Sequence, residues 1–283
     1  EVKMYKFGYV AILGKPNAGK STLINRLVGM RLAIVSSKPQ TTRDNILAIV
    51  NGKNYQLVLI DTPGIHKATS HLDKFMMKNV RTAKAGADVV VYLLDSSIAP
   101  DSQELEHIAK MKADGLNVIV AGSKSDKKKV DFDCDLFFSA VTGENVELLI
   151  DKILKFLPPS KTKNFLYGED EVTDKPVKFI VAEYVREGVL RVLKKEVPHG
   201  VAAVTTSFEE KPAIVNIEVE IVCEKQSHKG IIIGKGGETL KKIGTYARGM
   251  CEQLLGKKVM LKIFVKVEEG WKDKPNKLTD LGY

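Results

Sequence analysis

The sequence has few cysteines, and their placement is uninformative. Its 283 residues include only Cys134, Cys223 and Cys251, which are odd in number and far apart. This pattern argues against a disulfide framework and against a metal site with closely spaced ligands. The five histidines form no ligand-spaced pair either, so we expect them to be structural or surface residues.

Long apolar runs are also lacking. No run approaches the roughly 18 residues that a membrane helix needs, and residues 1–4 lack the apolar core of a signal peptide. We therefore expect a cytoplasmic protein without a transmembrane segment. The length favours two domains. The net charge of +9 indicates an acidic partner such as RNA or an anionic membrane.

A phosphate-binding loop is indicated near the N-terminus, where residues 14–21 have the sequence GKPNAGKS between an apolar run and a helix-like run. In this P-loop pattern, glycines let consecutive backbone N–H groups face a phosphate, and the helix N-terminus adds its positive dipole. The pattern predicts that Lys20 reaches the β- and γ-phosphates and that Ser21 binds Mg²⁺. The predicted nucleotide contacts here are Gly14, Lys15, Pro16, Asn17, Ala18, Gly19, Lys20, Ser21 and Thr22.

A second metal-binding element is predicted after a hairpin. Strands are expected at 46–50 and 56–60, and the second ends in Asp61-Thr62-Pro63-Gly64. An Asp at the end of a strand is well placed to hold Mg²⁺ through water, while the Gly64 N–H senses the γ-phosphate. The polar segment before the hairpin predicts an exposed loop, in which Thr42 completes the Mg²⁺ shell.

The rest of the first half alternates strands and helices. Strands are expected at 89–94, 118–121 and 136–138, and helices at 102–111 and 146–156. This order predicts an α/β domain whose mostly parallel sheet is covered on both faces. The loops at the carboxyl ends of its strands then build the nucleotide site.

The motifs of residues 7–157 resemble those of the translation-factor-type GTPases, and PNAGKS, QTTRD and DTPGI are most similar to the Era branch. By this resemblance, Asp126 in the SKSD sequence at 123–126 pairs with guanine N1 and the exocyclic amine. Lys124 packs over the base, and the Ala140 N–H donates to the guanine carbonyl oxygen. Ser139 and Val141 complete this predicted set, together with Ser123.

Two positions depart from the family pattern. Ser123 replaces an Asn whose amide donates to guanine N7 and ties neighbouring loops together. We expect this change to weaken GTP binding by about 1 to 3 kcal/mol, and Ser123→Asn to recover much of that loss. Ile65 replaces the Gln that orients the attacking water in Ras-like relatives, so intrinsic turnover should be slow.

Asn17 matches the position that holds K⁺ against the phosphates in related potassium-activated GTPases, where the cation substitutes for a positive finger. The cofactors expected by resemblance are therefore GTP or GDP, Mg²⁺ and K⁺. The predicted catalytic residues are Lys20, Thr42, Gly64 and Asn17, and the predicted metal-site residues are Ser21, Thr42 and Asp61.

A linker is predicted at 158–173, because the sequence LPPSKTKN is prolyl and polar and follows a helix that should have ended. Beyond it, the pattern predicts a second domain over 174–283 in the order α-β-β-α-α-β. The predicted helices and strands are a helix at 177–196, strands at 201–208 and 214–223, a short helix up to 234, a helix at 238–255 and a strand at 258–267.

An RNA-binding turn is predicted where two of these helices meet, in the sequence IIIGKGG at 231–237. A GxxG turn lets the backbone approach a sugar-phosphate chain, and the adjoining isoleucines form an apolar groove for unstacked bases. A plain glycine turn is the alternative, but the element order and the basic cluster at 225–248 favour a type II KH domain. The predicted RNA contacts are Lys229, Ile232, Ile233, Gly234, Lys235, Gly236, Gly237, Lys241, Lys242 and Arg248.

A GTPase domain at 1–157 followed by a KH domain resembles the Era family over nearly the whole chain. The resemblance implies a GTP-hydrolysing switch that binds the 3′ end of small-subunit ribosomal RNA and assists assembly of the small ribosomal subunit. It also implies peripheral association with the anionic inner face of the cell membrane. One alternative is an RNA-binding protein whose nucleotide pocket is weakened by Ser123. An ATPase is disfavoured, because Asp126 complements guanine. Trp271 and the tail lysines either contact RNA or pack on the domain.

Overall fold

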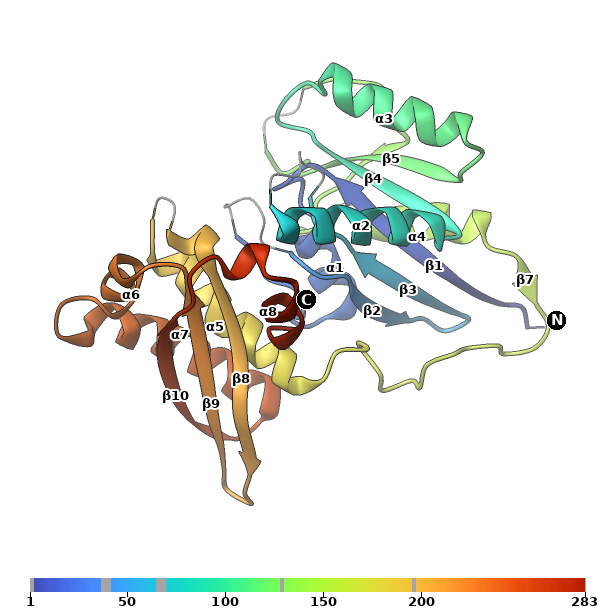
Figure 1. The fold of residues 1–283 in the computed structure, drawn as a ribbon. Coiled ribbons are helices and arrows are strands. Elements are labelled where there is room, and N and C mark those ends of the chain that lie inside the picture. The colour runs from blue at the N-terminus through green and yellow to red at the C-terminus, as the bar shows by residue number, and fades with distance from the viewer. Residues whose placement is uncertain (1–2, 37–41, 65–69, 128–129, 195–196, 283) are drawn as a thin grey trace. The chain divides into compact units, whose positions relative to one another are not determined.

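The fold is known from a computed structural model that describes residues 3–36, 42–64, 70–127, 130–194 and 197–282 (Figure 1). The chain forms two compact units, of which the first comprises Glu1–Ala68 and Phe75–Asp174 and the second comprises Thr69–Lys74 and Lys175–Tyr283. No helix of the described residues is long and apolar enough to cross a membrane.

The first unit is built on a mostly parallel sheet with the order β2-β3-β1-β4-β5-β6. Its strands are β1 (Tyr5–Gly14), β2 (Ile46–Asn51), β3 (Tyr55–Asp61), β4 (Val89–Asp95), β5 (Val118–Ser123) and β6 (Leu136–Phe137). Only β2 runs antiparallel to its neighbour in this order, and the short β7 (Pro159–Ser160) pairs antiparallel with β1. The predicted α/β class is confirmed.

Helices cover both faces of this sheet. They are α1 (Lys20–Val28), α2 (His71–Ala85), α3 (Ser102–Ala113) and α4 (Val146–Phe156). Val80 of α2 and Ile108 of α3 pack in one core with Ala11 and Leu13 of β1. Side chains alternate along a strand, and Ile12 between them is also fully buried, so the opposite face is covered as well. The sequence prediction omitted α2.

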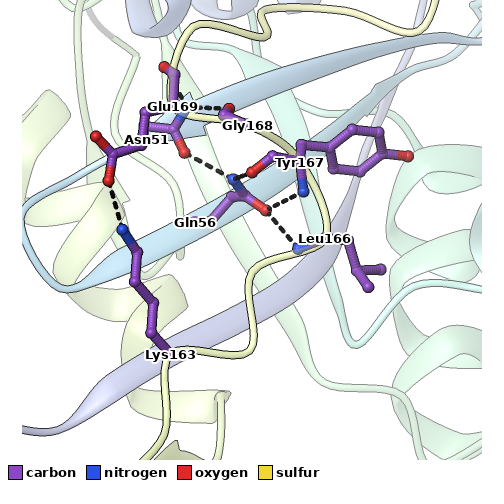
Figure 2. A network of polar contacts seen from close by, with 7 residues as sticks. All are labelled: Asn51, Gln56, Lys163, Leu166, Tyr167, Gly168 and Glu169. Carbon is purple, nitrogen blue, oxygen red and sulfur yellow. Dashed lines mark hydrogen bonds and ion pairs between the residues drawn. The ribbon is translucent and has the colours of Figure 1, made fainter.

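Gln56 of β3 ties the segment predicted as a linker to the first unit (Figure 2). Its side chain is fully buried. Its side-chain carbonyl accepts hydrogen bonds from the backbone N–H groups of Leu166 and Tyr167, both at 3.1 Å. Its amide nitrogen donates to the Tyr167 carbonyl at 2.9 Å and to Asn51 Oδ1 at 2.8 Å. The Gln56 amide therefore uses both donors and both acceptor positions.

The same segment then covers the outer edge of β2. The Ile49 N–H donates to the Val172 carbonyl at 3.0 Å, and Ala48 forms an antiparallel bridge with Thr173. Because β2 is an edge strand of the sheet, these contacts satisfy backbone groups that would otherwise be open to pairing with another chain. The end of the predicted linker is thus an ordered extension of the sheet.

We predict that Gln56→Leu releases this segment, because leucine has a similar size but leaves the backbone groups of Leu166 and Tyr167 without their side-chain partner. Each lost hydrogen bond contributes about 0.5 to 1.5 kcal/mol, so these two amides should exchange with solvent deuterium about two- to twelvefold faster. Gln103→Leu, on the exposed face of α3, is the matched control. Unchanged exchange at residues 166 and 167 would contradict the assigned role of Gln56.

The second unit has a three-stranded sheet in the order β10-β9-β8, with β9 parallel to β10 and antiparallel to β8. Its principal elements are α5 (Val177–Val192), β8 (Val201–Glu210), β9 (Ile214–Cys223), α6 (Gln226–Ile233), α7 (Glu238–Leu255) and β10 (Lys258–Val267). The order α-β-β-α-α-β is confirmed. Helix α5 ends at Val192, four residues before the predicted end.

The tail of the second unit packs on its own domain. Trp271 is fully buried and its indole Nε1–H donates to the Gly200 carbonyl at 3.3 Å. A short helix, α8 (Pro275–Asp280), follows it. Of the two alternatives for Trp271, the structure therefore selects packing, since a buried indole offers no face for a base to stack on.

Candidate nucleotide and RNA sites

The predicted nucleotide-binding residues meet at the carboxyl edge of the first sheet. The P-loop follows β1, Asp61 ends β3 and Ser123 ends β5. These three strands are parallel, so their carboxyl ends lie at one edge. A cavity of about 250 Å³ lies there, lined by residues of the P-loop and by Thr42, Gly64 and Lys124.

Glycines shape the P-loop for close approach. Gly14 has φ +144°, and a Cβ there would lie 2.6 Å from the Leu93 carbonyl oxygen. Gly64 brings the loop after β3 against the P-loop, where a Cβ would lie 2.8 Å from the Pro16 backbone nitrogen. Any side chain at Gly64 would therefore push these two segments apart.

Lys20 is held inside the loop. Its side chain is buried, and Nζ donates to the carbonyl oxygens of Gly14 at 3.0 Å and Lys15 at 2.8 Å. Burial lowers the pKa of Lys20 to about 8, against a smaller raising effect of Asp61. The two carbonyl oxygens therefore do not fully stabilise the charged form of Lys20, which an anionic ligand such as a phosphate would stabilise more strongly.

We predict that nucleotide binding takes up a proton at Lys20. Phosphate charge stabilises the ammonium and raises its pKa in the complex. At pH 8 about half a proton should be taken up per site, because free Lys20 has a pKa of about 8. Since raising the pH deprotonates the free form first, GTP affinity should fall above pH 8. Calorimetry in two buffers of different ionisation enthalpy measures the uptake, and it should vanish near pH 6.5.

Three oxygen-bearing side chains converge beside Lys20. Ser21 Oγ and Thr42 Oγ1 each lie 3.2 Å from Asp61 Oδ2, and the two hydroxyl oxygens are 3.3 Å apart. Asp61 is fully buried and Thr42 nearly so. Hydroxyl and carboxylate oxygens are the hard ligands that Mg²⁺ prefers, with phosphate oxygens and water completing its shell. The sequence predicted these three residues as one metal site, and the fold brings them together.

Each residue of the SKSD element at 123–126 has a side-chain partner in a different segment. Lys124 Nζ contacts Asp95 Oδ2 at 2.5 Å, at the end of β4. Ser139 Oγ donates to Asp126 Oδ1 at 2.5 Å and accepts from the Val141 N–H at 3.2 Å. The predicted guanine-binding loops, 123–126 and 139–141, therefore touch directly and orient the Asp126 carboxylate.

Ser123 keeps a tie that the sequence analysis expected to be lost. Its hydroxyl lies 2.6 Å from the Ala18 carbonyl oxygen in the P-loop and 3.1 Å from that of Leu94. Ser123 is buried, so the short side chain reaches these oxygens from the end of β5 without a longer amide. The expectation of a lost loop tie was therefore wrong, whereas the expected loss of the hydrogen bond to guanine N7 stays a prediction.

Sequence reasoning missed two anchors of the site. Lys15 pairs with Asp101 and, at 3.2 Å, with Glu104. These two acids form the capping box of α3, a spacing that is readable from sequence. Asp95 was also missed, although an acid at the carboxyl end of an apolar strand in the sequence indicates a residue at this edge of the sheet. Three positions of the family motifs, Gln40, Thr41 and Ile65, lie outside the described residues.

The predicted RNA-binding turn joins α6 to α7. Gly234 has φ +75° and ψ 172°, a combination that only glycine adopts readily, and Gly236 and Gly237 are left-handed. No neighbouring atom lies within 4 Å of a Cβ built at Gly236 or Gly237, so this backbone is open to a ligand. Lys235 in the turn and Lys241 and Lys242 in the first two turns of α7 are exposed, and Arg248 is exposed further along α7.

One predicted RNA contact is wrong. Ile232 is fully buried, whereas its neighbour Ile231 is 49% exposed. Consecutive residues of a helix point about 100° apart, so only one of them can face the core. Ile232 stabilises the second unit, and Ile231 presents the apolar surface next to the turn.

Comparisons with known proteins give the family of each half of the chain. A family model described as 50S ribosome-binding GTPase matches residues 9–124, and one described as KH domain matches residues 196–272. GTPase Era of Alkaliphilus metalliredigens is 41% identical over 295 aligned residues, which cover 99% of each chain. GTPase Era of Caldanaerobacter subterraneus is also 41% identical, over 99% of this chain and 98% of the relative.

Two solved structures of Era match the fold over at least 98% of this chain and 99% of their own, each with a TM-score of 0.92 and 33% identity. One is Era in complex with MgGDPNP and nucleotides 1506–1542 of 16S ribosomal RNA. The other is a single-residue variant of Aquifex aeolicus Era bound to GDP·AlF4⁻. Because GTPase Era relatives are 41% identical over 99% of this chain, the chain belongs to the Era family of GTPases.

Proposed function

We propose that this GTPase uses its nucleotide state to control the binding of the 3′ end of 16S ribosomal RNA by the second unit, during assembly of the small ribosomal subunit. The observation that carries the proposal is the presence, in one chain, of a P-loop site with its oxygen cluster and of an open, basic glycine turn. The related Era structure with MgGDPNP and 16S ribosomal RNA supports both ligands.

In the proposed mechanism, Lys20 leaves the carbonyl oxygens of the P-loop and binds the β- and γ-phosphates. Ser21, Thr42 and Asp61 would hold Mg²⁺, which when bound would neutralise charge that develops on the phosphate oxygens. The Gly64 N–H binds the γ-phosphate. Loss of that phosphate would remove this contact of Gly64 with the nucleotide.

Guanine recognition is proposed for the loops that follow β5 and β6. Asp126 accepts hydrogen bonds from N1 and the exocyclic amine, and Ser139 holds its carboxylate in place. Lys124 packs over the base, and the Ala140 N–H donates to the guanine carbonyl oxygen. The proposed limits of the two domains are 1–157 and 174–283.

Calorimetry with GTP, GDP, ATP and the RNA fragment 1506–1542 tests this function. We expect guanine nucleotides to bind far more tightly than ATP, and the RNA to bind with an affinity that differs between GDP and a non-hydrolysable GTP analogue. Equal binding of GTP and ATP would refute the assignment of Asp126. Equal RNA affinity with GDP and with the GTP analogue would refute the proposed control of RNA binding by the nucleotide.

We predict that K⁺ accelerates hydrolysis. Asn17 is an exposed P-loop residue in the left-handed conformation, φ +65°, and it lines the cavity of the nucleotide site. A K⁺ ion held there would add positive charge beside the phosphates, where the described lining of the cavity contains no arginine. Turnover should rise in K⁺ relative to Na⁺ at matched ionic strength, and Asn17→Ala should remove the difference. Equal rates in both salts would exclude this role.

The site of action is proposed to be the cytoplasm, with peripheral contact to anionic membrane. The net charge of +9 supports attraction to both RNA and anionic lipid.

A further inference from the structure

Ser125 is the one residue of the 123–126 element for which neither the sequence nor the proposed mechanism provides a role. It is only 7% exposed, and its N–H donates to the Phe138 carbonyl at 3.1 Å. Its hydroxyl donates to Glu144 Oε2 at 2.6 Å. Hydrogen bonds to an ionised carboxylate are shorter and stronger than neutral ones. Ser125 thereby joins the end of β5 to the turn that precedes α4.

The backbone at Glu144 is fixed on both sides. Gly143 and Asn145 are left-handed, with φ +90° and +56°, and the latter is an uncommon conformation for a residue with a side chain. Asn145 Nδ2 donates to the Phe137 carbonyl at 2.7 Å, and the Ser139 N–H donates to the Glu144 carbonyl at 3.0 Å. A helix start needs none of these contacts, so they serve to hold this turn in one place.

The turn is also anchored to α1. Arg26 NH1 donates to the Val141 carbonyl at 3.3 Å. A Cβ at Gly143 would lie 2.1 Å from Arg26 NH2, so glycine leaves room for the guanidinium as well as for its own backbone angle. The backbone that carries Glu144 is thus fixed by its neighbours, although the Glu144 side chain itself is exposed.

We propose that Glu144 is a positioning residue for guanine recognition, which acts through Ser125 on the neighbouring Asp126. The same two segments are joined twice, by Glu144 to Ser125 and by Ser139 to Asp126. Together the two bonds fix both the position of the 123–126 backbone and the direction of the Asp126 carboxylate. The inference rests on the proposed role of Asp126 as the group that reads the exocyclic amine of guanine.

The test compares GDP with inosine diphosphate, which lacks that amine. In Glu144→Ala the Asp126 carboxylate should be misplaced, so GDP affinity should fall by about three- to tenfold. Inosine diphosphate should lose less, and the preference for GDP should therefore shrink. Glu144→Gln, whose amide oxygen still accepts the serine hydroxyl, should remain near wild type.

Ser125→Ala should match Glu144→Ala, and the double variant should be no worse than either, because both remove the same bond. Glu147→Ala, an exposed acid one residue into α4, is the matched control and should change nothing. Equal losses for both nucleotides, or a lower melting temperature with an unchanged preference, would overturn the proposal in favour of a purely structural tie. If the wild-type protein itself shows no preference for GDP, the proposed guanine site fails instead.

Discussion

Replacing Lys20 by alanine should lower the affinity for GTP by roughly 100- to 10,000-fold, the largest effect expected of any single change in the nucleotide site. Charge-assisted hydrogen bonds to buried phosphate oxygens contribute about 1.5 to 3 kcal/mol each, and Lys20 is proposed to make two. The loss should appear as a higher dissociation constant for both GTP and GDP in titrations with a fluorescent nucleotide.

The fold should survive this change. The pKa of Lys20 in the folded chain, about 8, is below its ordinary value, so the fold disfavours the charged form. That destabilisation is fully present below pH 8 and disappears above the unfolded value of about 10.5. At pH 7 the ligand-free Lys20→Ala protein should therefore melt no lower than wild type, apart from a small cavity effect.

Lys20→Met separates charge from volume, because it keeps an unbranched side chain of similar length in the buried channel. It should bind GTP as poorly as the alanine variant while packing as well as lysine. If either variant binds GTP with wild-type affinity, the loop at 14–21 is not a phosphate site.

The parts of the fold that could be predicted are those in which local sequence and burial agree. Strand β4 is apolar at every position but the last because parallel strands are buried on both faces, and this pattern is visible without a structure. Helix α2 has the same kind of signal in Leu72, Met76, Val80 and Ala83, whose spacing fits one helix face. Its many charged residues masked that spacing.

The contacts between residues of the site were harder to predict from the sequence. That Ser123 meets Ala18, or Ser125 meets Glu144, depends on which strands are neighbours at the carboxyl edge. The order β2-β3-β1-β4-β5-β6 is not the order of the sequence, and periodicity does not determine it. Motif spacing identified the residues, whereas strand order decides which of them touch.

The second large effect is expected at the RNA-binding turn, where Gly236→Asp should weaken RNA binding by at least about tenfold. Gly236 is exposed, with φ +59° and no neighbouring atom within 4 Å of a Cβ. Asp tolerates this left-handed backbone better than most residues, so the turn should keep its shape. The new carboxylate then faces the RNA phosphates, and two like charges about 4 Å apart repel by roughly 1 to 4 kcal/mol near a protein surface.

Two variants isolate that charge. Gly236→Asn adds nearly the same volume without a charge and should lose much less affinity. Gly256→Asp adds the same charge at another left-handed glycine with open space, φ +63°, but at the far end of α7. The 18 residues of α7 place it roughly 27 Å from the turn, which is more than twice the screening length at physiological salt, so RNA binding should hardly change.

The measurement is fluorescence anisotropy with the RNA fragment 1506–1542 at several salt concentrations. Loss of one phosphate contact should reduce the slope of log affinity against log salt by about 0.7 for single-stranded RNA, in Gly236→Asp but not in Gly256→Asp. GTP hydrolysis without RNA should stay at the wild-type rate in all three variants, because the substitutions lie in the second unit. RNA binding by Gly236→Asp at wild-type affinity would mean that phosphates do not approach this turn, and the RNA site would then have to be sought elsewhere on the domain.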